Sequence, residues 1–235
     1  MFERPHHRRV AAILQALDAD LLAANGCLFG GGTAIALKHG EYRESVDIDF
    51  LVSEAKGYRA LRERLTGPQG IQAIARAGGL LEASREIRAD QYGIRTLLRT
   101  EGIDIKLEIV SEARIALQAP AAADRICGVA TLTPLDVIAT KLLANSDRWA
   151  DAAVMSRDLI DLAMMEPARE PFRLGAAKAA GAYGKSIAAD LGKAIEALRL
   201  RPHRLDRCME ALQMSTVPKA LLWKKIKALK AMSTP

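Results

Sequence analysis

The sequence lacks long hydrophobic runs and has few aromatic residues. No apolar run reaches the roughly 18–20 residues that a membrane-spanning helix needs, and the opening Met-Phe-Glu-Arg-Pro lacks the apolar segment of a signal peptide. Aromatic residues make up 4% of the chain, so we expect a core built largely from Ala, Leu and Ile, a composition that favours helices. We therefore expect a cytoplasmic protein without a membrane segment.

Cysteine and histidine are also scarce. Cys27, Cys127 and Cys208 form no C-x-x-C pair, and an odd number of scattered cysteines does not suit a disulfide framework. The four histidines show no metal-binding spacing. A reduced protein without a structural zinc is expected from this usage.

The positive charge is concentrated near the C-terminus. The whole chain carries +6, whereas the stretch from residue 170 to the end has thirteen Lys and Arg against five Asp and Glu, or +8, which leaves −2 for residues 1–169. A basic region beside a nearly neutral one suits a partner rich in phosphates, although a solvated helical surface has the same composition.

Hydrophobic periodicity predicts a mixed α/β region in the first part of the chain. An opening helix is predicted over 8–22, and buried strands are predicted at 27–29 and 46–52. Two alternating runs, 94–99 and 103–110, are joined by a short connection and predict a β-hairpin.

Only helices are predicted after residue 130. Thr133-Pro134-Leu135-Asp136 is a typical helix start, with an N-cap threonine, a proline at the first helical position and an early acid. The predicted helices span 134–146, 156–165, 173–199 with a break near Gly181 or Gly184, 204–213 and 218–231. We therefore predict an α+β protein with an α/β domain at 1–130 and a helical domain at 131–235.

The run FGGGTAIALKHGEYRESVDIDF, residues 29–50, carries the main functional signal. Residues two apart in a strand share a face, so Asp47 and Asp49 are predicted to project together while Val46, Ile48 and Phe50 are buried. The paired glycines before the predicted helix offer backbone N–H groups and a positive dipole end to a phosphate. An anion site next to two carboxylates indicates phosphoryl or nucleotidyl transfer.

These residues resemble a known signature. Gly31-Gly32-Thr33, Arg43, Ser45 and Asp47-x-Asp49 are similar to the motif of the polymerase-β-like nucleotidyltransferase superfamily, and most closely to its AbiEii/AbiGii-type family, largely toxins of toxin–antitoxin systems. The resemblance implies a nucleotidyltransferase-type mixed sheet with flanking helices, followed by a helical domain. It further implies an NTP substrate, two Mg²⁺ ions (or Mn²⁺), a tRNA acceptor and a cognate antitoxin.

A third carboxylate would complete the metal site with Asp47 and Asp49. Strand alternation places Asp104, Lys106 and Glu108 on one face, so either acid could lie beside the pair, depending on strand register. The Lys-x-Glu pattern of the resembling family favours Glu108, with Asp104 as the alternative.

The glycine turn and its surroundings supply the predicted nucleotide contacts. Gly31 and Gly32 would let the backbone approach the phosphates, with Thr33 adding a donor, although glycines also serve tight turns without any ligand. Arg43 and Ser45 precede the predicted strand 46–52, which carries Asp47 and Asp49. Ser45 could either bind a phosphate or brace the segment before Asp47.

A second group of motif residues lies in the helical half. Asp136-x4-Lys141 and Arg157-Asp158-x2-Asp161 resemble the family's D-x-x-x-x-K and R-D-x-x-D-L stretches. The resemblance implies that Lys141 reaches the triphosphate and that Asp158 orients Lys141 or a nearby base. Capping the helix is a sufficient role for Asp136.

The sequence thus predicts a metal-dependent enzyme that moves NMP from an NTP to an acceptor hydroxyl, with RNA as the acceptor. Two alternatives stay open. One is a small-molecule nucleotidyltransferase of the antibiotic-modifying kind. The other is a non-catalytic module that binds nucleotide or RNA.

Overall fold

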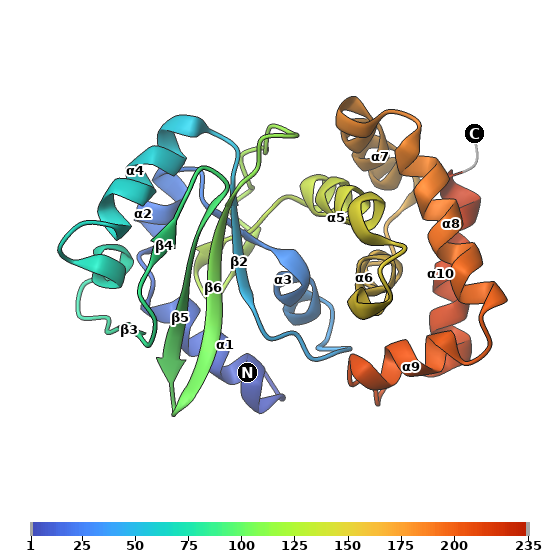
Figure 1. Cartoon of the computed structure of the whole chain (residues 1–235), viewed down its shortest axis with the longest axis horizontal. Coiled ribbons are helices and arrows are strands. Elements are labelled where there is room, and N and C mark those ends of the chain that lie inside the picture. The colour runs from blue at the N-terminus through green and yellow to red at the C-terminus, as the bar shows by residue number, and fades with distance from the viewer. Residues whose placement is uncertain (1, 234–235) are drawn as a thin grey trace. The chain divides into compact units, whose positions relative to one another are not determined.

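The computed structural model describes residues 2–233 and divides the chain into two compact units (Figure 1). The first unit comprises Met1–Lys38 and Ser45–Thr133, and the second comprises His39–Glu44 and Pro134–Pro235. The junction after Thr133 lies close to the predicted boundary at residue 130. The assignment of the short segment 39–44 to the second unit has no signal in the sequence.

A mixed sheet forms the centre of the first unit. The strand order is β1-β2-β6-β5-β3, and β4 also pairs with β5, at its N-terminal end. Strands β2 and β6 run parallel, and every other pair in this sheet is antiparallel. The strands are β1 (Leu28–Gly30), β2 (Ile48–Val52), β3 (Glu82–Ala83), β4 (Arg88–Ala89), β5 (Gly93–Thr100) and β6 (Ile103–Ser111), and a separate ribbon pairs β7 (Arg125–Ile126) with β8 (Val129–Ala130).

One face of this sheet is covered by helices, and the other carries charged residues. On β6, Ile105, Leu107 and Ile109 are fully buried and join a core that includes apolar residues of α1, α2 and α4 (Figure 1). The alternate residues of β6 therefore point to the opposite face. The helices of this unit are α1 (Pro5–Ala16), α2 (Ala19–Ala24), α3 (Gly31–Lys38), α4 (Ala55–Leu65) and the 3₁₀ helix η1 (Gly70–Ile74).

Two predictions for the first unit were wrong in detail. The helix predicted over 8–22 is divided into α1 and α2, because Asp18 adopts an extended conformation and its side chain accepts a hydrogen bond from the Leu21 amide, 2.9 Å. The strand predicted from Val46 begins at Ile48, and Val46 is 50% exposed. Asp47 therefore immediately precedes β2.

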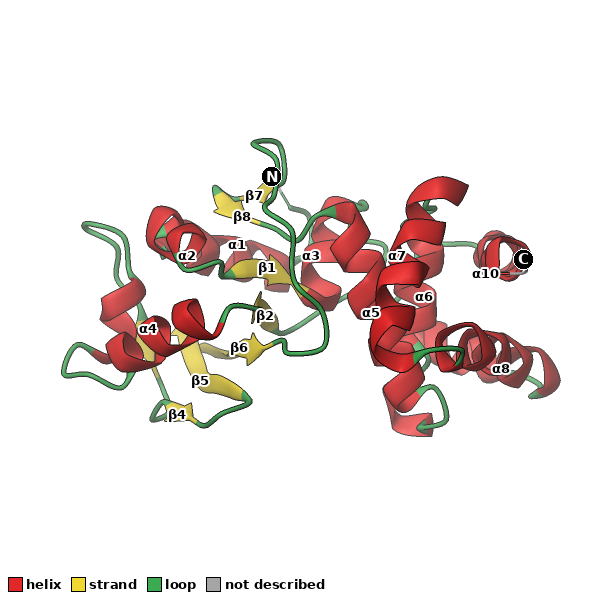
Figure 2. Cartoon of the chain, turned by 90° about the horizontal axis from the view of Figure 1, so that it is seen from above, coloured by secondary structure: helices red, strands yellow, loops and turns green. Residues whose placement is uncertain are grey.

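The second unit is built from helices (Figure 2). The predicted helix 173–199 is two helices, because Gly184 has φ +60° and ends the first of them. The elements are α5 (Pro134–Arg148), the 3₁₀ helix η2 (Ala152–Val154), α6 (Arg157–Met164), α7 (Arg169–Tyr183), α8 (Ser186–Leu200), α9 (Arg204–Ala211) and α10 (Lys219–Ser233). The predicted α+β class is confirmed. Within residues 2–233, no helix is both long and apolar enough to cross a membrane.

Candidate active site

The glycine turn between β1 and α3 lies directly against an acidic side chain. Gly30 is the register partner of Asp49, and α3 begins at the next residue, Gly31. Gly31 has φ +68°, and a Cβ at this position would overlap the Asp49 carboxylate and lie 2.8 Å from the Asp49 Cβ. Any larger residue would be strained and would push Asp49 aside. The start of α3 and the Asp49 carboxylate therefore share one small space.

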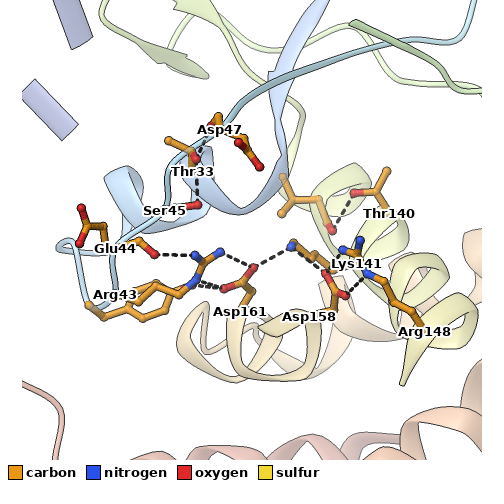
Figure 3. A network of polar contacts seen from close by, with 12 residues as sticks. Thr33, Arg43, Glu44, Ser45, Asp47, Thr140, Lys141, Arg148, Asp158 and Asp161 are labelled. Carbon is orange, nitrogen blue, oxygen red and sulfur yellow. Dashed lines mark hydrogen bonds and ion pairs between the residues drawn. The ribbon is translucent and has the colours of Figure 1, made fainter. Parts of the chain in front are cut away.

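Thr33 and Ser45 hold the backbone that leads to the acidic pair (Figure 3). Thr33 is buried, and its hydroxyl donates to the Asp47 carbonyl, 2.5 Å, and lies 2.8 Å from the Ser45 Oγ. The Ser45 amide donates to Nε2 of His7, a buried residue of α1, at 3.1 Å. Of the two roles left open for Ser45, these contacts favour bracing. Its contact with nucleotide stays a prediction.

Strand register decides which acid of β6 lies beside Asp49. Glu108 is its direct partner across the parallel β2–β6 pair. Asp104 is four residues earlier on β6, about 13 Å away along the strand, and it pairs with Arg99 of β5 instead. The geometry therefore favours Glu108 over Asp104 as the third carboxylate.

Glu108 is held by two cations of the same sheet. Lys106 Nζ lies 2.5 Å from Oε2, and Arg95 Nε lies 2.6 Å from Oε1. Burial raises the pKa of the Glu108 carboxyl, but the hydrogen bonds from Lys106 and Arg95 outweigh it and the pKa is lowered. Arg95 is itself held by Asp90, 3.2 Å away, so its guanidinium links both acids.

The donor chemistry of Asp47, Asp49 and Glu108 suits Mg²⁺ or Mn²⁺, because these ions prefer carboxylate oxygens. Two of the three acids are paired in register, and the third is two positions away along the chain. No group of three or more acids, histidines or cysteines within residues 2–233 is already arranged around a metal position. The present arrangement places Lys106 against Glu108 instead.

A second cluster of charges is buried in the helical unit (Figure 3). Asp161 accepts two bonds from the Arg43 guanidinium, at 2.7 and 3.0 Å, and one from the Tyr42 hydroxyl, at 2.6 Å. Lys141 Nζ lies 2.6 Å from Asp161 and 3.0 Å from Asp158. Asp161 is therefore the centre of a network that joins segment 39–44 to α5 and α6.

The pairing in this cluster outweighs the cost of burial. Burial raises the pKa values of Asp158 and Asp161, but Lys141 and the guanidinium groups of Arg43 and Arg148 lower them below the usual range. Burial lowers the pKa of Lys141, and the two acids raise it further than burial lowers it. All these groups are therefore charged at neutral pH.

These contacts also locate the remaining motif residues of the helical half. Lys141 and Arg43 are each bonded to carboxylates, so their predicted contacts with nucleotide remain predictions. Asp136 is fully buried in the first turn of α5 and forms an ion pair with Lys178 of α7. This pair adds a packing role to the predicted capping role.

Sequence reasoning missed several residues that shape these two clusters. Arg95 was not singled out, although the predicted hairpin places it on β5 beside the charged face of β6. His7 was assigned no role, and no spacing in the sequence links it to Ser45. Tyr42 lies next to the motif arginine, but its partner is far away in the sequence.

Comparisons with known proteins identify the fold and the family of this chain. Two crystal structures from Helicobacter pylori share the fold: a protein described as a candidate nucleotidyltransferase (20% identity, TM-score 0.52, covering 97% of this chain and 91% of that one) and JHP933 (20% identity, TM-score 0.55, covering 99% and 92%). A search of the curated proteins found no match. The family model "Nucleotidyl transferase AbiEii toxin, Type IV TA system" matches residues 12–231. The chain therefore belongs to the AbiEii family of nucleotidyl transferase toxins.

Proposed function

We propose that this toxin nucleotidyltransferase uses divalent metal ions to move NMP from an NTP to a hydroxyl group of RNA, with tRNA as the first acceptor to test. The observation that carries the proposal is the contact of Gly31 with Asp49, whose register partner is Glu108. The glycine turn proposed to bind phosphate thus lies against Asp49, and Glu108 lies beside Asp49 on the neighbouring strand.

Each part of the site has a defined role in this proposal. Asp47, Asp49 and Glu108 would hold two ions, which supply charge stabilisation to the transferring phosphoryl group and lower the pKa of the acceptor hydroxyl. The amides of Gly31, Gly32 and Thr33 at the start of α3 would bind the phosphates. The protein would thus act by positioning and charge neutralisation.

Lys141 and Asp158 are proposed to assist from the helical unit, with Arg43 and Ser45 as further candidates for contacting the nucleotide. Reaching a triphosphate would require the Lys141 ammonium to leave two carboxylates. A Lys141→Met variant separates the roles. If the variant loses transfer while urea denaturation shows that it is still folded, a substrate contact is supported. If transfer falls only in proportion to the folded fraction, Lys141 serves as a structural ion pair.

The proposal for an RNA acceptor rests on charge. Residues 170–235 carry +8, although three lysines of α10 are paired with acids: Lys219 with Asp206, Lys225 with Glu166 and Lys230 with Glu196. An RNA substrate should show a KM that rises steeply with salt, because binding releases counterions. A cationic small-molecule acceptor has no condensed counterions to release, so its KM would rise less steeply with salt.

The test is transfer of labelled NMP by the full chain. The protein is incubated with Mg²⁺, each α-labelled NTP and total tRNA, and compared with Asp49→Asn, Glu108→Gln and the control Asp104→Asn. We expect losses of about 10²- to 10³-fold for the first two variants and wild-type transfer for the third. Equal labelling by wild type and Asp49→Asn would refute the site, and labelling of aminoglycosides rather than tRNA would refute the RNA acceptor.

A further inference from the structure

Lys106 lies among the acids of the candidate active site. Strand alternation puts it on the same face of β6 as Glu108. Continuing the β2–β6 register by one pair beyond Ile48 and Leu107 places it opposite Asp47. Its Nζ lies 2.5 Å from Glu108 Oε2. Burial lowers the pKa of Lys106, but Glu108, Asp47 and Asp49 raise it further than burial lowers it.

Lys106 and Arg95 both bond Glu108, but they differ in their other acidic partners. Arg95 bonds Glu108 Oε1 and also forms an ion pair with Asp90, which is not one of the three proposed metal-binding acids. Within residues 2–233, Glu108 is the one acid that forms an ion pair with Lys106, and the other acids that raise the pKa of Lys106 are Asp47 and Asp49. Its side chain is 42% exposed, so the ammonium can move into water without a large desolvation change.

Lys106 balances part of the negative charge of the candidate active site. Asp47, Asp49 and Glu108 bring three negative charges together, and Lys106 with Arg95 supplies two positive ones. Without a cation, three carboxylates on neighbouring strand positions would repel one another. A divalent ion must approach the same oxygens, and Lys106 already bonds one of them.

We propose that Lys106 is the built-in counter-cation of the carboxylate site, which bonds the acids when no metal is bound and must leave them when a divalent ion binds. This inference rests on the proposed metal-dependent function. Metal binding is then an exchange of one cation for another, and Lys106 lowers the affinity of the empty enzyme for metal. The ammonium that leaves remains beside the site, where an anionic nucleotide could bind it.

The experiment measures Mn²⁺ binding to the full-length protein without nucleotide, by electron paramagnetic resonance. Lys106→Met is compared with wild type and with Lys38→Met, which removes an exposed lysine paired with Asp124 in the same unit. We expect on the order of tenfold tighter Mn²⁺ binding for Lys106→Met, because a nearby positive charge is removed. Lys38→Met should bind as wild type does. Equal or weaker binding by Lys106→Met would overturn the inference.

A second measurement uses the wild-type protein and does not depend on how the variant folds. Lysine acetylation by acetic anhydride is followed by mass spectrometry with and without Mn²⁺. Displacement predicts that Lys106 reacts several-fold faster when Mn²⁺ is present, while Lys38 is unchanged. An unchanged Lys106 rate in Mn²⁺-bound protein overturns the inference alone. Absence of Mn²⁺ binding by every form at millimolar concentration overturns the proposed metal-dependent function together with it.

Discussion

The molecule contains two clusters of charged side chains, one in each unit, that differ in how completely they are buried. In the first unit, Lys106 and Arg95 are 42% and 39% exposed beside Glu108. In the second, Asp161 is fully buried and Lys141 is 8% exposed. Breaking an ion pair therefore costs more in the second cluster than in the first. Water can solvate a cation that leaves the first cluster, whereas a cation that leaves its partner in the second becomes an unpaired buried charge.

The largest effect on stability is expected at the centre of the buried cluster. Asp161→Ala leaves Arg43 and Lys141 without a shared acceptor, and we expect a loss of about 3–5 kcal/mol in the free energy of unfolding. Urea denaturation measures it. Asp206→Ala, which removes an exposed pair with Lys219, is the control and should cost less than about 1 kcal/mol. Similar losses in both variants would abolish the distinction between buried and exposed ion pairs on which the comparison rests.

The pH dependence of stability tests the ion pairs of the buried cluster. The pKa of Asp158 lies below its ordinary value of 3.8 in the folded protein, so its contribution is present above pH 3.8 and is lost as the pH falls through the folded pKa. Asp158→Asn should cost about 2–3 kcal/mol at pH 7. Denaturation from pH 7 to pH 2 should show a constant difference from wild type down to about pH 5, which then narrows. A difference that widens on acidification would contradict the assignment.

A smaller loss of stability with a larger loss of activity is expected at the glycine turn. Gly31→Ala forces alanine to φ +68° at a cost of about 1–2 kcal/mol, and its Cβ displaces Asp49. The matched control is Gly128→Ala, which has φ +86° but nothing within 4 Å of the added carbon. Gly31→Ala should lose at least as much stability in urea as Gly128→Ala, because the two share the backbone strain and Gly31→Ala adds the clash with Asp49, and only Gly31→Ala should lose nucleotidyl transfer. Equal transfer by the two would separate Gly31 from the site.

The smallest effect is expected at the exposed end of β6. Asp104→Ala removes a surface pair with Arg99 and should change the free energy of unfolding by less than about 1 kcal/mol. Its rate of nucleotidyl transfer should match wild type, because Asp104 lies beyond the part of β6 that pairs with β2. A transfer rate as low as that of Asp49→Asn would reinstate Asp104 as the third carboxylate.

The sequence predicted local features better than distant partners. The α+β class, the helix beginning at Pro134 and the shared face of Asp104, Lys106 and Glu108 follow from capping and strand alternation, which are local. Alternation gives the face of a strand but not its register with a second strand. The placement of Glu108 beside Asp49 therefore required the β2–β6 pairing.

The buried cluster was the least predictable part. Arg43 and Asp161 are 118 residues apart, and their bidentate contact depends on how segment 39–44 packs on α6. Resemblance to the family singled out Lys141, Asp158 and Asp161 and implied that Asp158 orients Lys141, yet it did not indicate that Asp161 bonds both Lys141 and Arg43. A motif records which residues recur, whereas burial and pairing depend on tertiary packing.

The placement of segment 39–44 in the second unit means that the backbone passes between the units three times: after Lys38, after Glu44 and after Thr133. Cutting the gene at residue 133 would therefore not yield two intact halves. The N-terminal fragment would keep Arg43 but lose Asp161, and the C-terminal fragment would keep that carboxylate without its guanidinium. Reconstitution from two separately expressed fragments would require segment 39–44 of one fragment to bind the helices of the other and restore the Arg43–Asp161 pair. This toxin is therefore a poor candidate for a split reporter divided after residue 133.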